Sequence, residues 1–363
     1  MQNYLTEIFT DLFGNELAAQ ITTYVLSTVP VLAFIVLFVL FAVWLERKVS
    51  AHMQDRLGPM RVGWHGVLQT VADFIKLVQK EDIVADANDK TLFNIAPFLV
   101  FVATLATYTM LPFTSIFVGS NADVGIFLIL ALSGAVVAGI LMAGWASNNK
   151  YSLYGSLRAA AQIVSYEIPT ALVVLTMIMV YGTMNLGDVT QAQTSYFWNW
   201  GIFGGAGLGL GKFLLVPFMF VAFIILFIST LAESNRTPFD LPESESELVA
   251  GFNTEYSGIK FSMFFLAEFA NMFLIGSILV IFFLGGYNSP FGYVGNLIGV
   301  DWLIPIEQLF WFIAKGMFFV FISMWLRWTL PRVRVDQLMT ICWKYLIPYA
   351  FFNLLIVGLI LLV

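Results

Sequence analysis

The sequence is poor in charge, cysteine and histidine. Only 11% of its 363 residues are charged and 60% are apolar, whereas about 25% are charged in a soluble domain. A water-soluble fold of this composition would expose too much apolar surface to stay dispersed. Windows of about 20 apolar residues, long enough to cross a bilayer, recur along the whole chain. We therefore predict an all-α polytopic membrane protein, because the windows lack the alternation of a β-barrel strand.

Few residues could hold a redox group. Cys342 is the only cysteine, which excludes an internal disulfide and an iron–sulfur cluster held by several thiolates. The two histidines, His52 and His65, lie in one polar loop, whereas a haem between membrane helices takes its ligands from facing helices. We expect no redox centre within this chain.

Eight apolar stretches are long enough to be membrane spans. Their predicted bounds are Tyr24–Leu45, Phe93–Pro112, Val124–Trp145, Ala159–Tyr181, Phe213–Leu231, Phe261–Leu284, Leu303–Leu326 and Tyr345–Val363. We predict that these spans and their loops form one integral membrane domain over residues 1–363.

Basic residues gather on one side of this topology. All of the 17 Lys and Arg except Lys212 and Lys315 fall at residues 46–90, 146–160, 232–260 and 327–344, which follow every second span. The positive-inside rule places these loops in the cytoplasm or matrix and both termini outside. Residues 1–23 are acidic and lack the basic start of a secretory signal, so we predict a short helix on the outer face.

The loop at 46–90 contains an amphipathic pattern. Its apolar stripe is formed by Val67, Val71, Phe74 or Ile75 and Val78, and its polar stripe by Gln69, Asp73, Lys76 and Lys80. A helix of this kind suits a lipid surface and a specific protein partner equally well. Before it, Arg47 and Arg56 are candidates for binding a polar ligand head or a lipid phosphate.

The fourth span begins with a polar face. Arg158, Gln162 and Tyr166 are spaced i, i+4, i+8, and Glu167 is adjacent. Glu167 lies about 12 Å along the helix from the start of the span, at 1.5 Å per residue. A carboxylate inside a span is costly and points to function, such as a proton relay. The structural alternative is an ion pair with Arg158 or Lys315.

Two further loops carry dense charge. A short segment around Arg236 contains five carboxylates: Glu233, Asp240, Glu243, Glu245 and Glu247. A further carboxylate, Glu268, follows on the next span. Pro238 and Pro242 break the helix there. The segment is either a solvated acidic surface or a chain of carboxylates leading into the membrane. The last loop holds Arg327, Arg332 and Arg334, which suit an anionic partner or lipid.

Together these segments resemble the signatures of the quinone-site membrane subunit of respiratory complex I, the family of NADH–quinone oxidoreductase H subunits to which mitochondrial subunit 1 belongs. The matching segments keep their order and lie on one side of the predicted topology: Glu46-Arg47-Lys48, Gln54–Pro59, Ala72–Leu77, Arg158–Gln162, Ser165–Glu167, Ala232–Asp240, Gly251–Tyr256 and Leu330–Met339. Met60, Ser234 and Ser244 depart from the usual family residues, and none of these changes a charge.

The resemblance implies a function that needs no redox centre in this chain. Electrons would pass from NADH through flavin and iron–sulfur clusters in peripheral partner subunits, while this chain forms the membrane part of the quinone chamber. The substrate would be ubiquinone or menaquinone, and the membrane that of a bacterial cell or a mitochondrion. Other membrane subunits and lipid would be neighbours, and no nucleic acid is expected.

The resemblance also implies roles for particular residues. Positions near the quinone chamber or its docking face would be Arg47, Gln54, Arg56, Arg332 and Arg334. The carboxylates linking quinone reduction to proton translocation would be Glu167, Glu233, Glu243, Glu245, Glu247 and Glu268. Further candidates are Glu46, Asp73, Lys76, Arg158, Gln162, Tyr166, Arg236, Asp240 and Lys315.

Two other functions also fit intramembrane carboxylates. The membrane anchor of an energy-converting hydrogenase shares much of this pattern, and there the catalytic partner would hold nickel. A proton-coupled secondary transporter would be expected to show broken spans near the midplane or a repeat of two halves. The sequence shows no convincing repeat, and its carboxylates crowd one half of the membrane. A purely structural anchor would leave the buried glutamates unexplained.

Overall fold

The computed structural model describes residues 16–205, 210–242 and 244–362. Within these residues the only β-type pairing is an isolated bridge between Pro112 and Val118, and every other regular element is a helix. The predicted all-α class is therefore confirmed.

In the described residues, eight helices are long and apolar enough to cross a membrane, as predicted. They are α2 (Glu16–Met53), α4 (Lys90–Thr109), α5 (Gly125–Ala146), α6 (Lys150–Tyr181), α8 (Leu210–Glu233), α10 (Gly258–Phe283), α12 (Ile304–Thr329) and a last span formed by α13 (Val335–Thr340), a π-helical turn (Ile341–Leu346) and α14 (Ile347–Leu362). Shorter elements lie between them, including α3 (Gln69–Gln79), α7 (Leu186–Ala192), α9 (Glu245–Leu248) and α11 (Val294–Ile298).

Several spans extend beyond the predicted bounds because helices continue through polar residues at the membrane surface, whereas α4 ends at Thr109, before the predicted Pro112. Residues 16–23, expected to belong to a separate outer-face segment, are the first turns of α2, whereas residues 1–15 lie outside the described chain. Arg158 likewise lies within α6, whose first residue is Lys150. Asn149 caps that helix by accepting a hydrogen bond from the backbone N–H of Tyr151.

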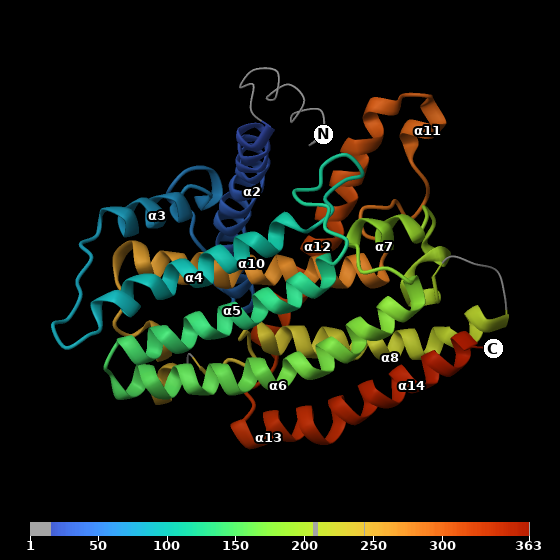
Figure 1. Cartoon of the computed structure of the whole chain (residues 1–363). Helices are drawn as coiled ribbons and strands as arrows, with labels where there is room; N and C mark the ends of the chain where they lie inside the picture. Colours follow the sequence, from blue (N-terminus) through green and yellow to red (C-terminus); the bar gives the residue numbers. More distant parts are fainter. Residues whose placement is uncertain (1–15, 206–209, 243, 363) are drawn as a thin grey trace.

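In Figure 1, α4, α5, α6 and α8 run side by side, α14 lies along α6 and α8, and α2 stands across the group. Helix α10 is central, since it contacts α2, α3, α4, α8 and α12. Glycine allows the closest approaches: a Cβ at Gly276 of α10 would lie 3.0 Å from the Gly316 carbonyl oxygen of α12. Tyr108 of α4 donates a hydrogen bond to the Ala270 carbonyl at 2.6 Å, which ties α4 to α10.

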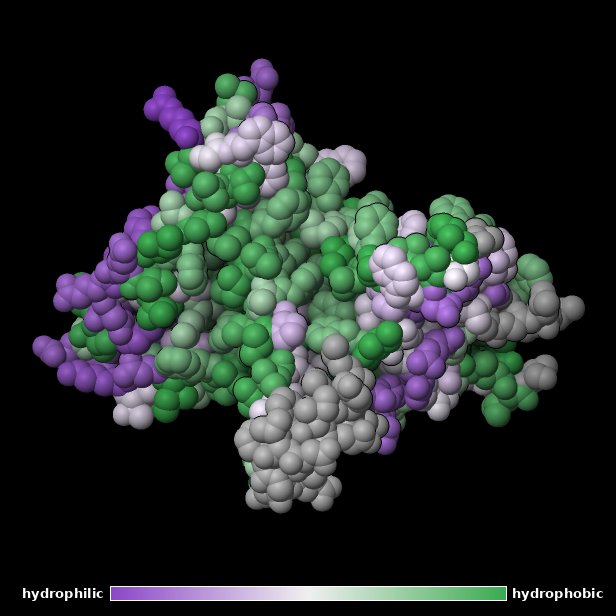
Figure 2. All heavy atoms as spheres, turned by 90° about the horizontal axis from the view of Figure 1, so that it is seen from above, coloured by the Kyte–Doolittle hydropathy of each residue, from purple (hydrophilic) through white to green (hydrophobic). Residues whose placement is uncertain are grey.

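The surface is apolar over a broad area, and Figure 2 shows one group of hydrophilic residues at the left edge, where Figure 1 places α3 and the loop after it, and a second group toward the right. The predicted amphipathic helix is confirmed as α3, and its apolar residues are divided between two sides. Phe74 lines a cavity between α2, α3 and α10, whereas Ile75 and Val78 are each 49% exposed. Asp73 of the polar stripe faces α2 and bonds Arg47 in a partly exposed contact, so Ile75 and Val78 are left for lipid or a partner.

Candidate functional site

Four charged side chains from different parts of the chain meet in one buried cluster. Glu46 comes from α2, Arg236 from the loop after α8, Glu268 from α10 and Arg327 from α12. Arg236 Nη1 lies 3.2 Å from Glu46 Oε2, and its Nη2 lies 3.1 Å from Glu268 Oε1. Arg327 donates to the other oxygen of Glu46. Two guanidinium groups thus balance two carboxylates, the arrangement that makes buried charge tolerable.

The cluster forms one wall of a cavity of about 390 Å³. Phe261, Phe265 and Trp328 add apolar surface to the lining. A second cavity of about 240 Å³ adjoins it between α2, α3 and α10, and Val43, Arg47, Phe261 and Phe265 line both. We call the two cavities together the chamber. The first cavity holds the charged cluster, and the second is lined mostly by apolar side chains of α2, α3 and α10, together with Arg47, Asp73 and Lys76.

Arg47 and Asp73 join α2 to α3 at the boundary between the two cavities. Their Nη1 and Oδ2 atoms lie 2.6 Å apart, and Gln69 Nε2 donates to the other oxygen of Asp73 at 3.1 Å. Burial raises the pKa of Asp73, but the hydrogen bonds from Arg47 and Gln69 outweigh it and hold the pKa below its usual value. Lys76, predicted on the polar stripe, also lines the second cavity.

The acidic loop after α8 is held by specific contacts rather than being freely solvated. Gln162 Nε2 of α6 donates to the carbonyl oxygens of Ala232 at 2.7 Å and Phe239 at 2.8 Å. Asp240 pairs with Arg332 at 3.3 Å. Burial raises the pKa of Asp240 despite the opposing effect of Arg332.

Glu247 of α9 lies at 2.5 Å from Arg158 of α6, and this hydrogen bond and charge hold the pKa of Glu247 below its usual range. Glu243 lies outside the described residues, as does the side chain of Glu245. The predicted part of Glu243 and Glu245 in a chain of carboxylates therefore stays a prediction.

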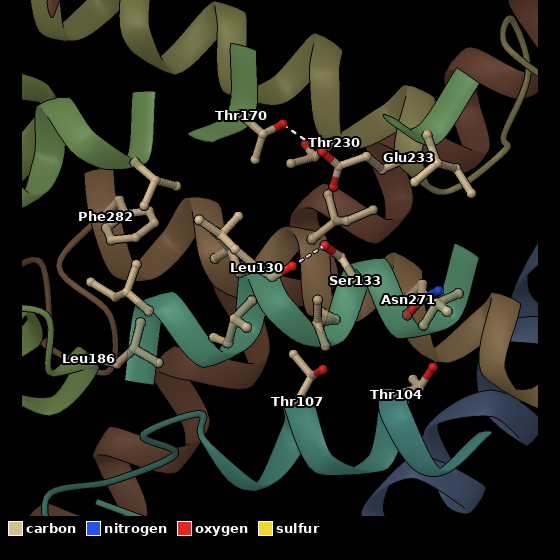
Figure 3. A pocket seen from close by; sticks show the side chains of 18 residues that line it. Thr104, Thr107, Leu130, Ser133, Thr170, Leu186, Thr230, Glu233, Asn271 and Phe282 are labelled. Atoms are coloured by element: carbon tan, nitrogen blue, oxygen red, sulfur yellow. Dashed lines mark hydrogen bonds between the residues drawn. The ribbon is translucent and has the colours of Figure 1, made fainter. Parts of the chain in front are cut away.

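Glu167 and Glu233 lie at a second site, shown in part in Figure 3. Thr170 donates to Glu233 Oε1 at 2.6 Å, and Ser133 of α5 donates to Glu167. Glu233 lines a narrow cavity of about 90 Å³ between α4, α5, α6, α8 and α10. The cavity is mostly apolar, with polar side chains at intervals: Thr104, Thr107, Ser133, Thr170, Thr230 and Asn271.

The structural alternative for Glu167, an ion pair with Arg158 or Lys315, is wrong. Arg158 pairs with Glu247, and Lys315 Nζ donates to the backbone carbonyls of Leu284, Gly286 and Asn288. Tyr166, one residue before Glu167, donates to the Leu338 carbonyl at 3.0 Å and so ties α6 to α13.

The remaining arginine-rich segments lie outside the chamber. Arg56 is exposed and donates to Gln54 at 2.7 Å in the loop after α2. Arg332 binds Asp240, and Arg334 is exposed at the start of α13. Of the five residues predicted near the chamber or its docking face, only Arg47 lines it.

Sequence reasoning missed the hydroxyl groups that serve the carboxylates. Thr170 stands three residues after Glu167 and four after Tyr166, so helical spacing could have indicated its place on the polar face. Ser133 lies in an apolar span with no neighbouring charge, and no local signal marks it. No group of three or more His, Cys, Asp or Glu side chains that could hold a metal occurs in the described part of the chain.

Comparison with known proteins gives a consistent result. A family model described as NADH dehydrogenase matches residues 26–358. The chain is similar to the H subunit of the NADH-quinone oxidoreductase of Chlorobium luteolum, with 49% identity over 92% of this chain and 88% of that protein. It is similar to H subunit 2 of the NADH-quinone oxidoreductase of Cytophaga hutchinsonii, with 45% identity over 90% of this chain and 96% of that protein. It is also similar to the H subunit of the same enzyme of Bacteroides fragilis, with 41% identity over 99% of this chain and 96% of that protein.

Proposed function

The chain belongs to the family of NADH-quinone oxidoreductase H subunits, and we propose that it forms the membrane part of the quinone chamber and the carboxylate path that couples quinone reduction to proton translocation. As a subunit of this enzyme complex it is an integral membrane protein whose partners are the other subunits. The observation that carries the proposal is the chamber with its wall of Glu46, Arg236, Glu268 and Arg327.

The chamber suits a ligand with a polar head and an apolar tail. Small-molecule sites are mostly apolar cavities in which a few polar groups fix orientation. Here the charged wall lies in the first cavity, Arg47 lies where the two cavities adjoin, and aromatic and aliphatic side chains of α2, α3 and α10 line most of the second. A quinone has this division, with a polar ring and an apolar isoprenoid tail. The quinone would enter from the lipid side at α3, with its ring toward the charged wall and its tail along the apolar lining.

Reduction of a quinone to a quinol takes up two electrons and two protons. The electrons would come from the iron–sulfur clusters of partner subunits, so this chain has to hold the substrate and handle protons. A change of charge in the chamber acts directly on Glu268 and Glu46, because both share Arg236 and a low-dielectric wall. Their protonation would therefore follow the state of the substrate.

Helix α10 offers a short connection from the chamber to the second site. Glu268 lines the chamber, and Asn271, three residues later on the same helix, lines the cavity that holds Glu233. Three residues of α-helix place two side chains on one face, about 5 Å apart. A proton leaving the chamber would thus pass Glu268 and Asn271 and reach Glu233, which Thr170 orients, with Glu167 nearby on α6.

The membrane and the sidedness are part of the same proposal. The relatives named above are bacterial, and we propose that this chain is located in a bacterial plasma membrane. The basic loops would face the cytoplasm, where the peripheral subunits have to dock to deliver electrons, and both termini would lie on the outer side.

The test is to purify the tagged chain from membranes in mild detergent and to identify its partners. We expect a large assembly with flavin and several iron–sulfur clusters, and NADH–quinone reductase activity that quinone-site inhibitors abolish. Nickel and hydrogen evolution in the same fraction would instead mean a hydrogenase anchor. A chain that purifies alone and folded would overturn the proposal and reopen the transporter alternative.

A further inference from the structure

Lys315 is a buried cation that the proposed mechanism does not use. Its Nζ donates to the carbonyl oxygens of Leu284 at 2.7 Å, Gly286 at 3.1 Å and Asn288 at 2.6 Å. The ring of Trp200 lies 4.1 Å from the same nitrogen, in cation–π contact. Among the ion pairs of the described residues none involves Lys315. The three carbonyl oxygens and the ring stabilise the protonated ammonium form of this side chain.

The three carbonyl groups and the ring of Trp200 form a cage around Lys315 Nζ, and further hydrogen bonds make this cage rigid. Asn288, whose carbonyl is one of the three acceptors, donates through Nδ2 to the Thr190 carbonyl at 2.7 Å and the Gln193 carbonyl at 3.1 Å. Gln193 in turn donates to the Ile281 carbonyl and accepts from the backbone N–H of Gly285 at 2.9 Å. These bonds tie the end of α10 to α7 and hold in place the segment that carries the three acceptor carbonyls.

The cage stands at the end of the Glu233 cavity that lies away from Glu233. Phe282 and Leu186 line that end, as Figure 3 shows. Phe282 is two residues before Leu284, which binds Lys315, and Leu186 is the first residue of α7, whose Thr190 packs on Gly286. Under the predicted orientation this is the outer side of the membrane.

We propose that Lys315 is a fixed positive charge that closes the outer end of the Glu233 cavity to protons and other cations. The inference rests on the proposed function, in which this cavity receives protons from the chamber. A cavity that carries protons from one side needs a barrier toward the other, or the gradient leaks back through it. Fixed positive groups beside a narrow, mostly apolar passage exclude protons and cations in other membrane proteins.

The competing explanation is that Lys315 only caps the C-terminus of α10. Cations do stabilise helix C-termini, and the bond to the Leu284 carbonyl fits that role. The two explanations differ in what they require: a cap needs a hydrogen-bond donor, whereas a barrier needs a charge. Lys315→Gln keeps a donor without the charge, Lys315→Arg keeps both, and Lys315→Met keeps neither.

The experiment uses the complete complex in proteoliposomes without NADH. A potassium diffusion potential drives protons inward, and a trapped pH dye reports the passive leak. We expect Lys315→Gln and Lys315→Met to leak about tenfold faster than the wild type, which corresponds to a barrier lowered by about 1.4 kcal/mol. Lys315→Arg stays as tight as the wild type. Lys344→Gln, an exposed basic residue at the opposite predicted side, is the matched control and stays tight.

Each other result overturns the inference. A tight Lys315→Gln variant beside a leaky Lys315→Met variant assigns the lysine a hydrogen-bonding role. If neither variant leaks protons faster than the wild type, Lys315 forms no barrier. If Lys315→Gln fails to assemble while Lys315→Arg assembles, the charge is needed for folding. NADH–quinone activity of the wild-type complex is measured on the same vesicles. Its absence would refute the proposed function, whereas its presence with no leak difference refutes only the barrier.

Discussion

Arg236 and Glu268 form a buried ion pair in which Nη2 of the arginine lies 3.1 Å from Oε1 of the glutamate. Only 4% of the Arg236 side chain is exposed, and the ring of Phe269 lies 4.3 Å from its guanidinium carbon. The arginine also holds Glu46, so one side chain from a loop joins α2 to α10. The shape and charge of the chamber wall depend on it.

Replacing this arginine should be among the most damaging single changes in the chain. Arg236→Met leaves two carboxylates beside one remaining guanidinium, and breaking a buried pair in this way costs about 3–5 kcal/mol. We expect lower thermal stability of the purified complex and loss of quinone reduction, measured by thermal inactivation and NADH–quinone assay. Arg61→Met, at an exposed arginine outside the chamber, is the control and should change neither property. A stable, active Arg236→Met complex would contradict the role given to the pair.

Glu233 should carry protons rather than hold the fold. Glu233→Gln keeps an oxygen that accepts the Thr170 hydrogen bond but cannot exchange a proton at neutral pH. We expect assembly to be retained and proton translocation to fall by about tenfold or more, which is the scale on which a proton-transfer group acts. Proton uptake by a vesicle dye during NADH oxidation measures it.

A matched control for Glu233→Gln is Glu307→Gln. Glu307 accepts from the backbone N–H groups of Val294 and Gly295, each at 2.9 Å, and so caps α11 instead of lining the cavity. The Glu307→Gln complex should translocate protons at the wild-type rate. Equal pumping by the Glu233 variant and the wild type would remove Glu233 from the path.

Filling the chamber should weaken quinone binding more than it harms the fold. Val43 of α2 lines both cavities, and a phenylalanine there occupies the space between them. We expect KM for quinone to rise about tenfold with kcat largely kept, while overpacking costs about 1–3 kcal/mol of stability. Val29→Phe, at a 55% exposed position of the same helix, is the control. Unchanged KM in the Val43→Phe complex would place the quinone elsewhere.

Asp73 should act as a permanent charge. Its pKa lies below the usual value of 3.8, because the bonds from Arg47 and Gln69 outweigh the effect of burial. The stability from its ion pair is therefore fully present above the unfolded pKa and is lost only as the pH falls through the lower folded value. Asp73→Asn should reduce quinone reductase activity by the same factor from about pH 5.5 to about pH 8.

The Asp73 effect should also be modest. Both side chains of the pair are partly exposed, and such pairs are worth about 0.2–1 kcal/mol. A pH–activity profile of the complex measures it, with Gln69→Glu as a companion variant that changes the same contact. If the difference in quinone reductase activity between the wild type and Asp73→Asn disappeared within this pH range, Asp73 would titrate there.

Two glycines of α5 should respond oppositely to alanine. A Cβ at Gly144 would lie 2.0 Å from Ser156 Oγ and 2.9 Å from the Ser152 carbonyl, so α5 and α6 would have to separate. A Cβ at Gly134 meets nothing within 4 Å. We expect Gly144→Ala to destabilise the complex by about 1–3 kcal/mol and Gly134→Ala to be neutral or slightly stabilising. Thermal inactivation measures both, and equal shifts would contradict the close packing.

Much of the fold could be predicted from local patterns. The eight spans follow from apolar runs whose length matches a bilayer, and the part of the chain that the structure describes has eight such helices. The amphipathic stripe at 67–80 predicted α3, but periodicity does not say which stripe faces the protein. Asp73 faces inward because Arg47 of α2 lies there to pair with it, a contact across 26 residues of sequence.

The candidate site could be predicted only in part. Arg236, Glu268 and Glu46 stand out as charges beside or within apolar runs, but their partners lie on different helices and no spacing relates them. For the same reason Glu167 was open to pairing with Arg158 or Lys315, and the structure gives it Ser133 instead.

By itself, the sequence determined that the chain is a bundle of membrane helices and which side collects the positive charge. Both follow from the cost of placing polar groups in hydrocarbon, which acts on each segment separately. Only the tertiary structure decided the partner of each buried charge and the place of the chamber. A buried charge must be neutralised by whatever packing brings within a few ångströms, and packing depends on all the helices at once.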